Sequence, residues 1–229
     1  MHRWIAIGLL LCGMAAAHPA AAQSKSWREL RAKNLRIGLS EERVDRAMAA
    51  CRAADLPLAE AETLFGPVFA AHDEKLSADC VLLRIEEGLA KHVGWAEVQQ
   101  AADRRLQGMR QADRLIMAAR SRRGGQHDHL MMHTCMAIES GLPIEVFEHL
   151  FSRPGGFRYG RMIHVVEAGE ALTLAGLADG QTLLLMNDFL DRDLAGFEIF
   201  RVVDLVRAGL RDGKDFETIH ATLWAAGEP

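Results

Sequence analysis

Residues 137–151, AIESGLPIEVFEHLF, are the stretch that decides the fold. The pattern predicts the end of one helix, a tight corner and the start of a second helix. Gly141 can adopt the left-handed conformation that ends a helix, and Pro143 suits the start of the next one, where a missing N–H costs little. The apolar side chains after the corner fall on one helical face: Ile144, Phe147, Leu150 and Phe151. The stretch is therefore typical of two antiparallel helices joined by a short turn.

Similar corners recur along the chain, at Gly38-Leu39, Asp55-Leu56-Pro57, Gly176-Leu177 and Gly209-Leu210. Apolar residues between the corners repeat at helical spacing, and no segment alternates with period two for long. We therefore expect an all-α fold of about ten helices, in which antiparallel helix pairs form a short solenoid or a compact bundle.

Two pairs of short motifs indicate an internal repeat. Leu56-Pro57 and Leu142-Pro143 lie 86 residues apart, and so do Leu64-Phe65 and Leu150-Phe151. This spacing predicts two four-helix copies followed by a partial third copy.

Gly124-Gly125 marks the expected boundary between a first helical unit, 23–123, and a second unit with the partial third copy, 124–229. We expect the two units to pack together as one domain. Within them, Gly66-Pro67 and Pro154-Gly155-Gly156 are expected to break the chain.

Residues 1–22 have the pattern of a secretory signal peptide. A short basic start precedes an apolar run, and Ala20-Ala21-Ala22 provides small residues before Gln23. The alternative of a membrane anchor is disfavoured because the run is shorter than the roughly 20 apolar residues that a span needs. A lipoprotein would use Cys12, but Leu11 stands where a small residue is expected. We expect a periplasmic or secreted chain without stable membrane insertion after cleavage.

The charge of the chain argues against nucleic acid as a partner. The formal net charge is −4, and loss of Arg3 with the leader would make it −5. The densest basic spot, at residues 120–123, is better explained as the capping of a helix C-terminus. Aromatic residues make up only 6% of the chain, with a single tyrosine, so the stacking surfaces of single-strand binders are not evident.

Three cysteines would remain after cleavage: Cys51, Cys80 and Cys135. An oxidising compartment favours one disulfide, and Cys51 with Cys80 is the expected pair because they lie on neighbouring predicted helices. The alternative is that all three are small buried apolar residues.

One cluster has the residue types of a metal site. His129 and His133 lie four residues apart, so both would face the same side of a helix and could bind zinc or copper. His127 or Asp128 would supply a further ligand. The alternative is structural: Asp128 would cap the helix, and Met132, Met136 and Cys135 would be buried.

No catalytic motif stands out in the sequence. The chain has no Gly-x-Ser-x-Gly elbow, no His-Glu-x-x-His pair and no phosphate-binding Gly-Lys-Ser/Thr loop. Glu167 with Glu170, and Glu86 with Glu87, could in principle perform acid–base chemistry, but such pairs usually belong to a solvated helix face.

Parts of the sequence resemble uncharacterised exported proteins of Gram-negative bacteria with repeated helix, Gly-Leu/Val-Pro corner and amphipathic helix. The matching residues are EGLAKHV (87–93) continuing into Ala96-Glu97-Val98 and Arg104-Arg105-Leu106, together with the Leu56-Pro57 and Gly141-Leu142-Pro143 corners. The resemblance implies a periplasmic helical protein and carries over no catalytic residue.

Three functions follow as hypotheses. The first is a non-catalytic periplasmic helical-repeat scaffold that binds a protein or peptide partner. The second is a periplasmic copper or zinc protein that uses the cluster from His127 to Met136. The third is an enzyme with an unrecognised site, since an active site can be assembled from residues far apart in the sequence.

Overall fold

The computed structural model describes residues 26–120, 124–153 and 157–225, and every regular element in these ranges is a helix. The N-terminal helices are α1 (Trp27–Arg36), α2 (Glu41–Ala53), α3 (Leu58–Asp73), α4 (Ala78–Ala90) and α5 (Trp95–Ala119). The C-terminal helices are α6 (His127–Glu139), α7 (Ile144–Phe151), α8 (Tyr159–Leu174), α9 (Asp179–Asp191), α10 (Gly196–Arg211) and α11 (Phe216–Ala225). The all-α prediction is confirmed, with eleven helices in the described part of the chain.

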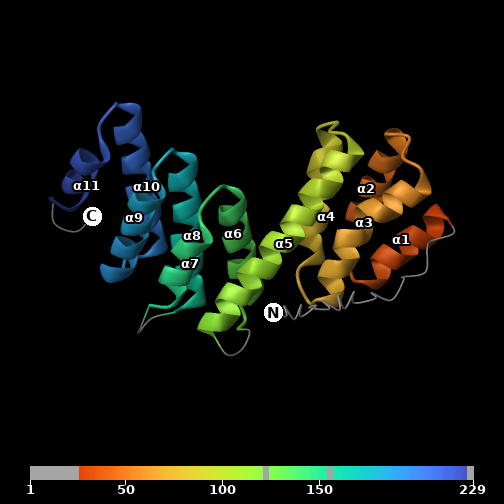
Figure 1. Ribbon diagram of the computed structural model, residues 1–229, viewed down its shortest axis with the longest axis horizontal. Helices are drawn as coiled ribbons and strands as arrows, with labels where there is room; N and C mark the ends of the chain where they lie inside the picture. Colours follow the sequence, from red (N-terminus) through yellow and green to blue (C-terminus); the bar gives the residue numbers. More distant parts are fainter. Residues whose placement is uncertain (1–25, 121–123, 154–156, 226–229) are drawn as a thin grey trace, which may run out of the picture.

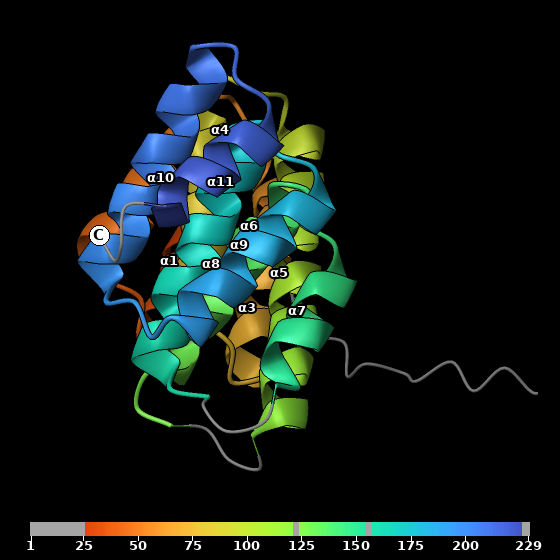
Figure 2. The same cartoon turned by 90° about the vertical axis from the view of Figure 1, so that its left-hand side faces the viewer.

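The helices follow one another along the long axis of the molecule, so that α1 and α11 lie at opposite ends (Figure 1). The odd-numbered helices from α1 to α9 contact one another in order. Among the even-numbered helices, α2 contacts α4, α6 contacts α8, and α8 contacts α10. In the view along the stack, α8 and α10 lie to one side of α7 and α9 (Figure 2). Among the described residues, every extensive contact joins helices at most two apart in the chain.

Helix α5 joins the two halves of the stack. It packs against α3 and α4 on one side and against α6 and α7 on the other (Figure 1). Arg105 of α5 is buried and makes a two-point ion pair with Glu139 of α6, through Nε and Nη2 at 2.8 Å each. The predicted boundary at Gly124-Gly125 therefore lies next to an extensively packed pair of helices.

The corners share one backbone design. At seven of them the residue after a left-handed residue donates its N–H to the carbonyl five positions earlier, as Leu142 does to Ala137 at 3.0 Å. This is the hydrogen bond of a Schellman motif, and the corner leucine is usually buried. Gly141, with φ of 103°, confirms the predicted left-handed position. Pro143 immediately precedes α7 instead of forming its first residue.

Two predicted interruptions of helices are wrong. The expected corner at Gly209-Leu210 lies inside α10, and the left-handed glycine that follows this helix is Gly213. Pro67 lies inside α3, which continues through Gly66-Pro67 to Asp73. The neighbouring Gly66 has no Cβ to oppose the proline ring, so the helix tolerates the residue that usually ends it. The other expected break, at residues 154–156, lies outside the described residues, as does the leader.

The predicted 86-residue repeat has a counterpart in the helix starts. Helix α6 begins 86 residues after α2, and α7 begins 86 residues after α3. The halves then differ in length, because α3 has 16 residues and α7 only 8. No described helix is long and apolar enough to cross a membrane.

Candidate functional site

An apolar groove lies between the C-terminal half of α5 and the short helix α7. It has a volume of about 470 Å³. Leu115 and Ala118 of α5, with Ile144 and Phe151 of α7, provide its apolar lining. Since α5 has 25 residues and α7 only 8, α7 lies against only part of the α5 surface.

A second hollow of about 620 Å³ continues this groove and shares four lining residues with it: Ala118, Ala119, Phe151 and Ser152. Its other lining residues are mostly basic or aromatic: Arg120, Arg153, Phe157 and Arg158. The two hollows form one surface, which we call the α5–α7 groove. It is apolar at one end and strongly basic at the other.

The charge of the α5–α7 groove is opposite in sign to that of the whole chain. Arg114, Arg120, Arg153 and Arg158 line it, and Glu148 is its only acidic lining residue. Arg114 and Arg158 are exposed, and neither forms an ion pair within the part of the chain that the structure describes. These two guanidinium groups can therefore bind an incoming carboxylate without first breaking an internal bond.

The other two arginines are held in place. Arg120 donates to the carbonyl of Phe157 and lies over the Phe157 ring at 5.1 Å. Arg153 of the α7–α8 connection donates to Asn187 and Asp191 of α9. Edge-on contacts at 5.3 Å join the rings of Phe151, Phe157 and Tyr159 into one wall.

The predicted histidine pair forms as expected. His129 and His133 share one face of α6, with ring centroids 5.2 Å apart. That face meets α8, where Glu167 Oε1 lies 3.3 Å from His133 Nε2. The other oxygen of the same carboxylate, Oε2, lies 3.3 Å from His164 Nδ1. Burial lowers the pKa of His133, and Glu167 opposes that effect.

The predicted further ligands lie elsewhere. His127 is buried, and its Nε2 lies 2.7 Å from Asp113 Oδ1 of α5, away from the His129–His133 face. Asp128 is exposed within the first turn of α6, and the N-cap position belongs to Gln126. The structure therefore does not bring His127 and Asp128 together with His129 and His133, because the helical turn directs them to different sides. Sequence reasoning did not connect Glu167 and His164 with this pair, because only the packing of α8 on α6 brings them near.

Among the described residues, as their side chains lie in the structure, no group of three or more His, Cys, Asp or Glu is arranged to hold a metal ion. The cysteine of α6 does not face this side of the helix. Cys135 is buried against α5, where its Sγ lies 3.5 Å from the carbonyl oxygen of Arg105, and burial raises its pKa to about 12.

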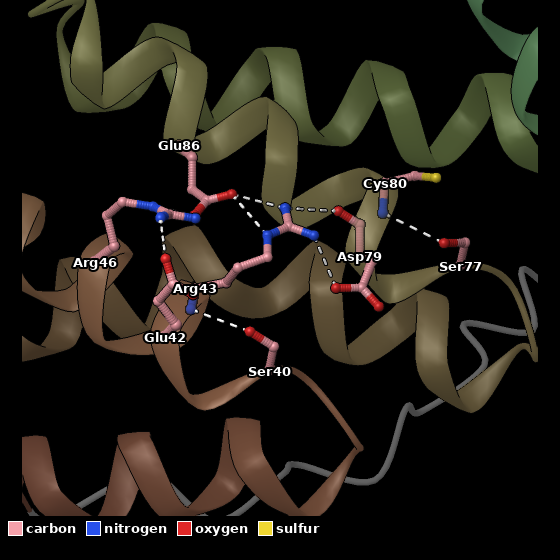
Figure 3. Close-up of polar contacts among 8 residues, drawn as sticks. All are labelled: Ser40, Glu42, Arg43, Arg46, Ser77, Asp79, Cys80 and Glu86. Atoms are coloured by element: carbon pink, nitrogen blue, oxygen red, sulfur yellow. Dashed lines mark hydrogen bonds and ion pairs between the residues drawn. The ribbon is translucent and has the colours of Figure 1, made fainter.

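Cys51, Cys80 and Cys135 are free thiols in the structure. Helices α2 and α4 run parallel, and Arg43 of α2 contacts Asp79, the neighbour of Cys80 (Figure 3). Cys51 lies eight residues beyond Arg43, which is about 12 Å further along the helix, whereas a disulfide needs Cα atoms within about 7 Å. The structure therefore does not support the expected pairing of Cys51 with Cys80.

The candidate carboxylates are engaged by neighbouring side chains. Glu86 receives hydrogen bonds from Arg43 at 2.6 Å and from Arg46 at 3.2 Å, as Figure 3 shows. Arg84 donates to Glu87 at 3.1 Å. On α8, Glu170 accepts a hydrogen bond from Ser140 Oγ at 2.8 Å. Each of these carboxylates is therefore already bonded to a side chain of the protein itself.

No family model matches this chain, and neither does any curated protein or solved structure. A functional proposal therefore rests on the geometry of the α5–α7 groove and of the α6–α8 face.

Proposed function

We propose that this chain is a non-catalytic interaction scaffold that binds an acidic amphipathic segment of a partner protein in the α5–α7 groove. The observation that carries the proposal is an apolar floor with Arg114 and Arg158 exposed at its rim, where neither forms an ion pair with another described residue. An amphipathic helix offers apolar residues for such a floor and carboxylates for such a rim. Helical stacks commonly present extended binding surfaces of this kind.

The size and charge of the groove support a peptide over a small metabolite. The groove is open, and its two hollows of about 470 and 620 Å³ continue into one another. Four arginines face one glutamate in a chain whose overall charge is −4, so a carboxylate-rich partner is attracted locally and a basic one is repelled.

The proposed location is the periplasm, supported by the basic start, apolar run and alanine-rich cleavage pattern of residues 1–22. N-terminal sequencing of the mature protein should begin at or near Gln23. An intact Met1 on the protein in cells would contradict this location.

Three fluorescent synthetic helices test the binding proposal. The first carries leucines on one face and glutamates on the other, the second has lysine in place of glutamate, and the third has serine in place of leucine. Fluorescence anisotropy should show binding of the first helix only, and binding should weaken as salt is raised. Equal binding of the acidic and basic helices would contradict the proposal.

A double charge reversal, Arg114→Glu with Arg158→Glu, should weaken binding of the acidic helix by at least about tenfold, as expected for lost charge-assisted contacts. The matched control is Arg28→Glu with Arg207→Glu, which makes the same change in net charge at exposed positions on α1 and α10. Equal affinity in both double variants would remove the groove as the binding surface.

A further inference from the structure

The second surface of interest is the α6–α8 seam, formed by His129 and His133 of α6 with His164 and Glu167 of α8. Within each helix the spacing puts two donors on neighbouring turns, four residues apart on α6 and three apart on α8. Glu167 joins the two helices, because its carboxylate lies 3.3 Å from both His133 and His164. The seam lies outside the α5–α7 groove and uses none of its lining residues.

The corresponding seam in the first half of the chain, between α2 and α4, differs from the α6–α8 seam in the groups around its central carboxylate. Counted from the first residue of each helix, Glu86 of α4 and Glu167 of α8 occupy the same position, and so do Arg43 of α2 and His129 of α6. In the first seam two arginines neutralise the carboxylate (Figure 3). In the second seam imidazoles surround it, and within the described ranges no Lys or Arg forms an ion pair with Glu167.

The presence of histidines instead of arginines changes the chemistry of the seam. A guanidinium satisfies a carboxylate permanently and cannot bind a metal, whereas a neutral imidazole can. Two carboxylates, Glu167 and the neighbouring Glu170, lie beside the three imidazoles, so the donor set of the seam suits a cation. Three imidazoles and a carboxylate are typical ligands of zinc, and the lack of a thiolate disfavours the sulfur-seeking Cu(I) ion.

We propose that His129, His133, His164 and Glu167 bind one zinc ion between α6 and α8. Zinc requires donors at about 2.0–2.2 Å, so the present hydrogen bonds of 3.3 Å must be exchanged for metal bonds by rotation of the side chains. His129 is exposed and the His164 side chain is 45% exposed, which leaves room on the solvent side of both rings for them to move.

The surroundings of His164 restrict where its ring can lie. A Cβ added at Gly196 of α10 would lie 2.7 Å from its Cδ2, so the absence of a side chain there lets α10 approach the ring. The Phe200 ring packs edge-on against His164 at 6.0 Å. Glu170 lies three residues beyond Glu167 on α8 and accepts a hydrogen bond from Ser140, so it adds a second carboxylate beside the proposed ligands.

The test is calorimetric titration of the full mature chain with zinc chloride alone near pH 7.5. We expect one zinc ion per chain with a micromolar or tighter Kd. His129→Ala, His164→Ala and Glu167→Gln should each weaken binding by at least about tenfold. The first two residues are exposed enough that the fold should survive, which circular dichroism checks.

His72→Ala with His149→Ala is the matched control, because both histidines are exposed on other helices. That variant should bind zinc as the wild type does. Absence of binding by the wild type at 100-fold excess of zinc over protein would overturn the site. Unchanged affinity in the seam variants would also overturn it and show that zinc binding is adventitious. Peptide binding in the groove is a separate measurement, so either proposal can fail alone.

Discussion

Four of the left-handed corner positions carry residues other than glycine: Asp55, Lys75, His92 and Asp193, with φ between 52° and 59°. A side chain costs about 1–2 kcal/mol in this conformation. A buried leucine follows Asp55, Lys75 and Asp193, and at all four corners the hydrogen bond made by the next residue holds the turn nonetheless.

Two opposite substitutions test this account of the corners. Gly141→Ala should lower the free energy of unfolding by about 1 kcal/mol, because open space surrounds the added Cβ and only the φ of 103° opposes it. His92→Gly should raise the free energy of unfolding by about 0.5–1 kcal/mol, since glycine adopts the left-handed conformation without a steric cost. Denaturant unfolding measures both.

Gly180→Ala is the control for the corner substitutions. Gly180 also has open space around it, but it lies within α9 and its φ is not positive. Alanine there should be neutral or slightly stabilising. A loss equal to that of Gly141→Ala would show that the left-handed backbone is not the cause.

The sequence was sufficient for the corners at Gly38, Asp55, Gly141 and Gly176, and insufficient for the other four left-handed positions. Gly141 and Gly176 are recognisable because glycine tolerates positive φ, whereas Lys75-Leu76 and His92-Val93 carry no such signal. The signal that could have found them is the apolar residue directly after a helix end, as at Leu76 and Leu142. That pattern is common to nearly all the corners.

At the scale of helices, the contacts of α5 with α6 hold the two halves of the stack together. Arg105 is central to them, because its guanidinium pairs with Glu139 and its carbonyl oxygen lies near Cys135. Burial lowers the pKa of Arg105, but the hydrogen bonds to Glu139 and the charge of that carboxylate outweigh this effect and raise it. A buried charge that loses its partner is costly, so this pair should be sensitive to change.

Arg105→Met should lower the free energy of unfolding by about 2 kcal/mol, in the range for hydrogen bonds to charged groups, because Glu139 would lose both bonds. Arg104→Met is the matched control at the exposed neighbouring position and should stay within about 0.5 kcal/mol of the wild type. Chemical denaturation of the two variants under the same conditions measures both free energies of unfolding. Equal losses would show that the ion pair does not stabilise the α5–α6 contact.

Helix periodicity predicted the elements but not the candidate sites. The shared face of His129 and His133 follows from their spacing alone. Glu167 is 34 residues beyond His133, and only the packing of α8 on α6 brings the two within 3.3 Å. The α5–α7 groove depends in the same way on where the short α7 ends, which no local pattern specifies.

At the scale of the whole molecule, each helix contacts only its close neighbours in the chain, so a disturbance should stay local. Val44→Ala, which opens a cavity in α2, should speed hydrogen exchange in α1 to α4 and leave α8 to α11 nearly unchanged. Hydrogen–deuterium exchange with mass spectrometry measures this. Uniform acceleration over all eleven described helices would instead indicate a single cooperative bundle.

The order of contacts along the stack also bears on how the chain acquires its structure during synthesis. Every extensive contact closes only a short segment of chain, because the helices involved are at most two apart. Such local topologies fold quickly. Helices α1 to α4 can bury their shared faces while α10 is still being translated. Helix α5 then offers a surface to α6 and α7, and the later helices assemble on those that precede them.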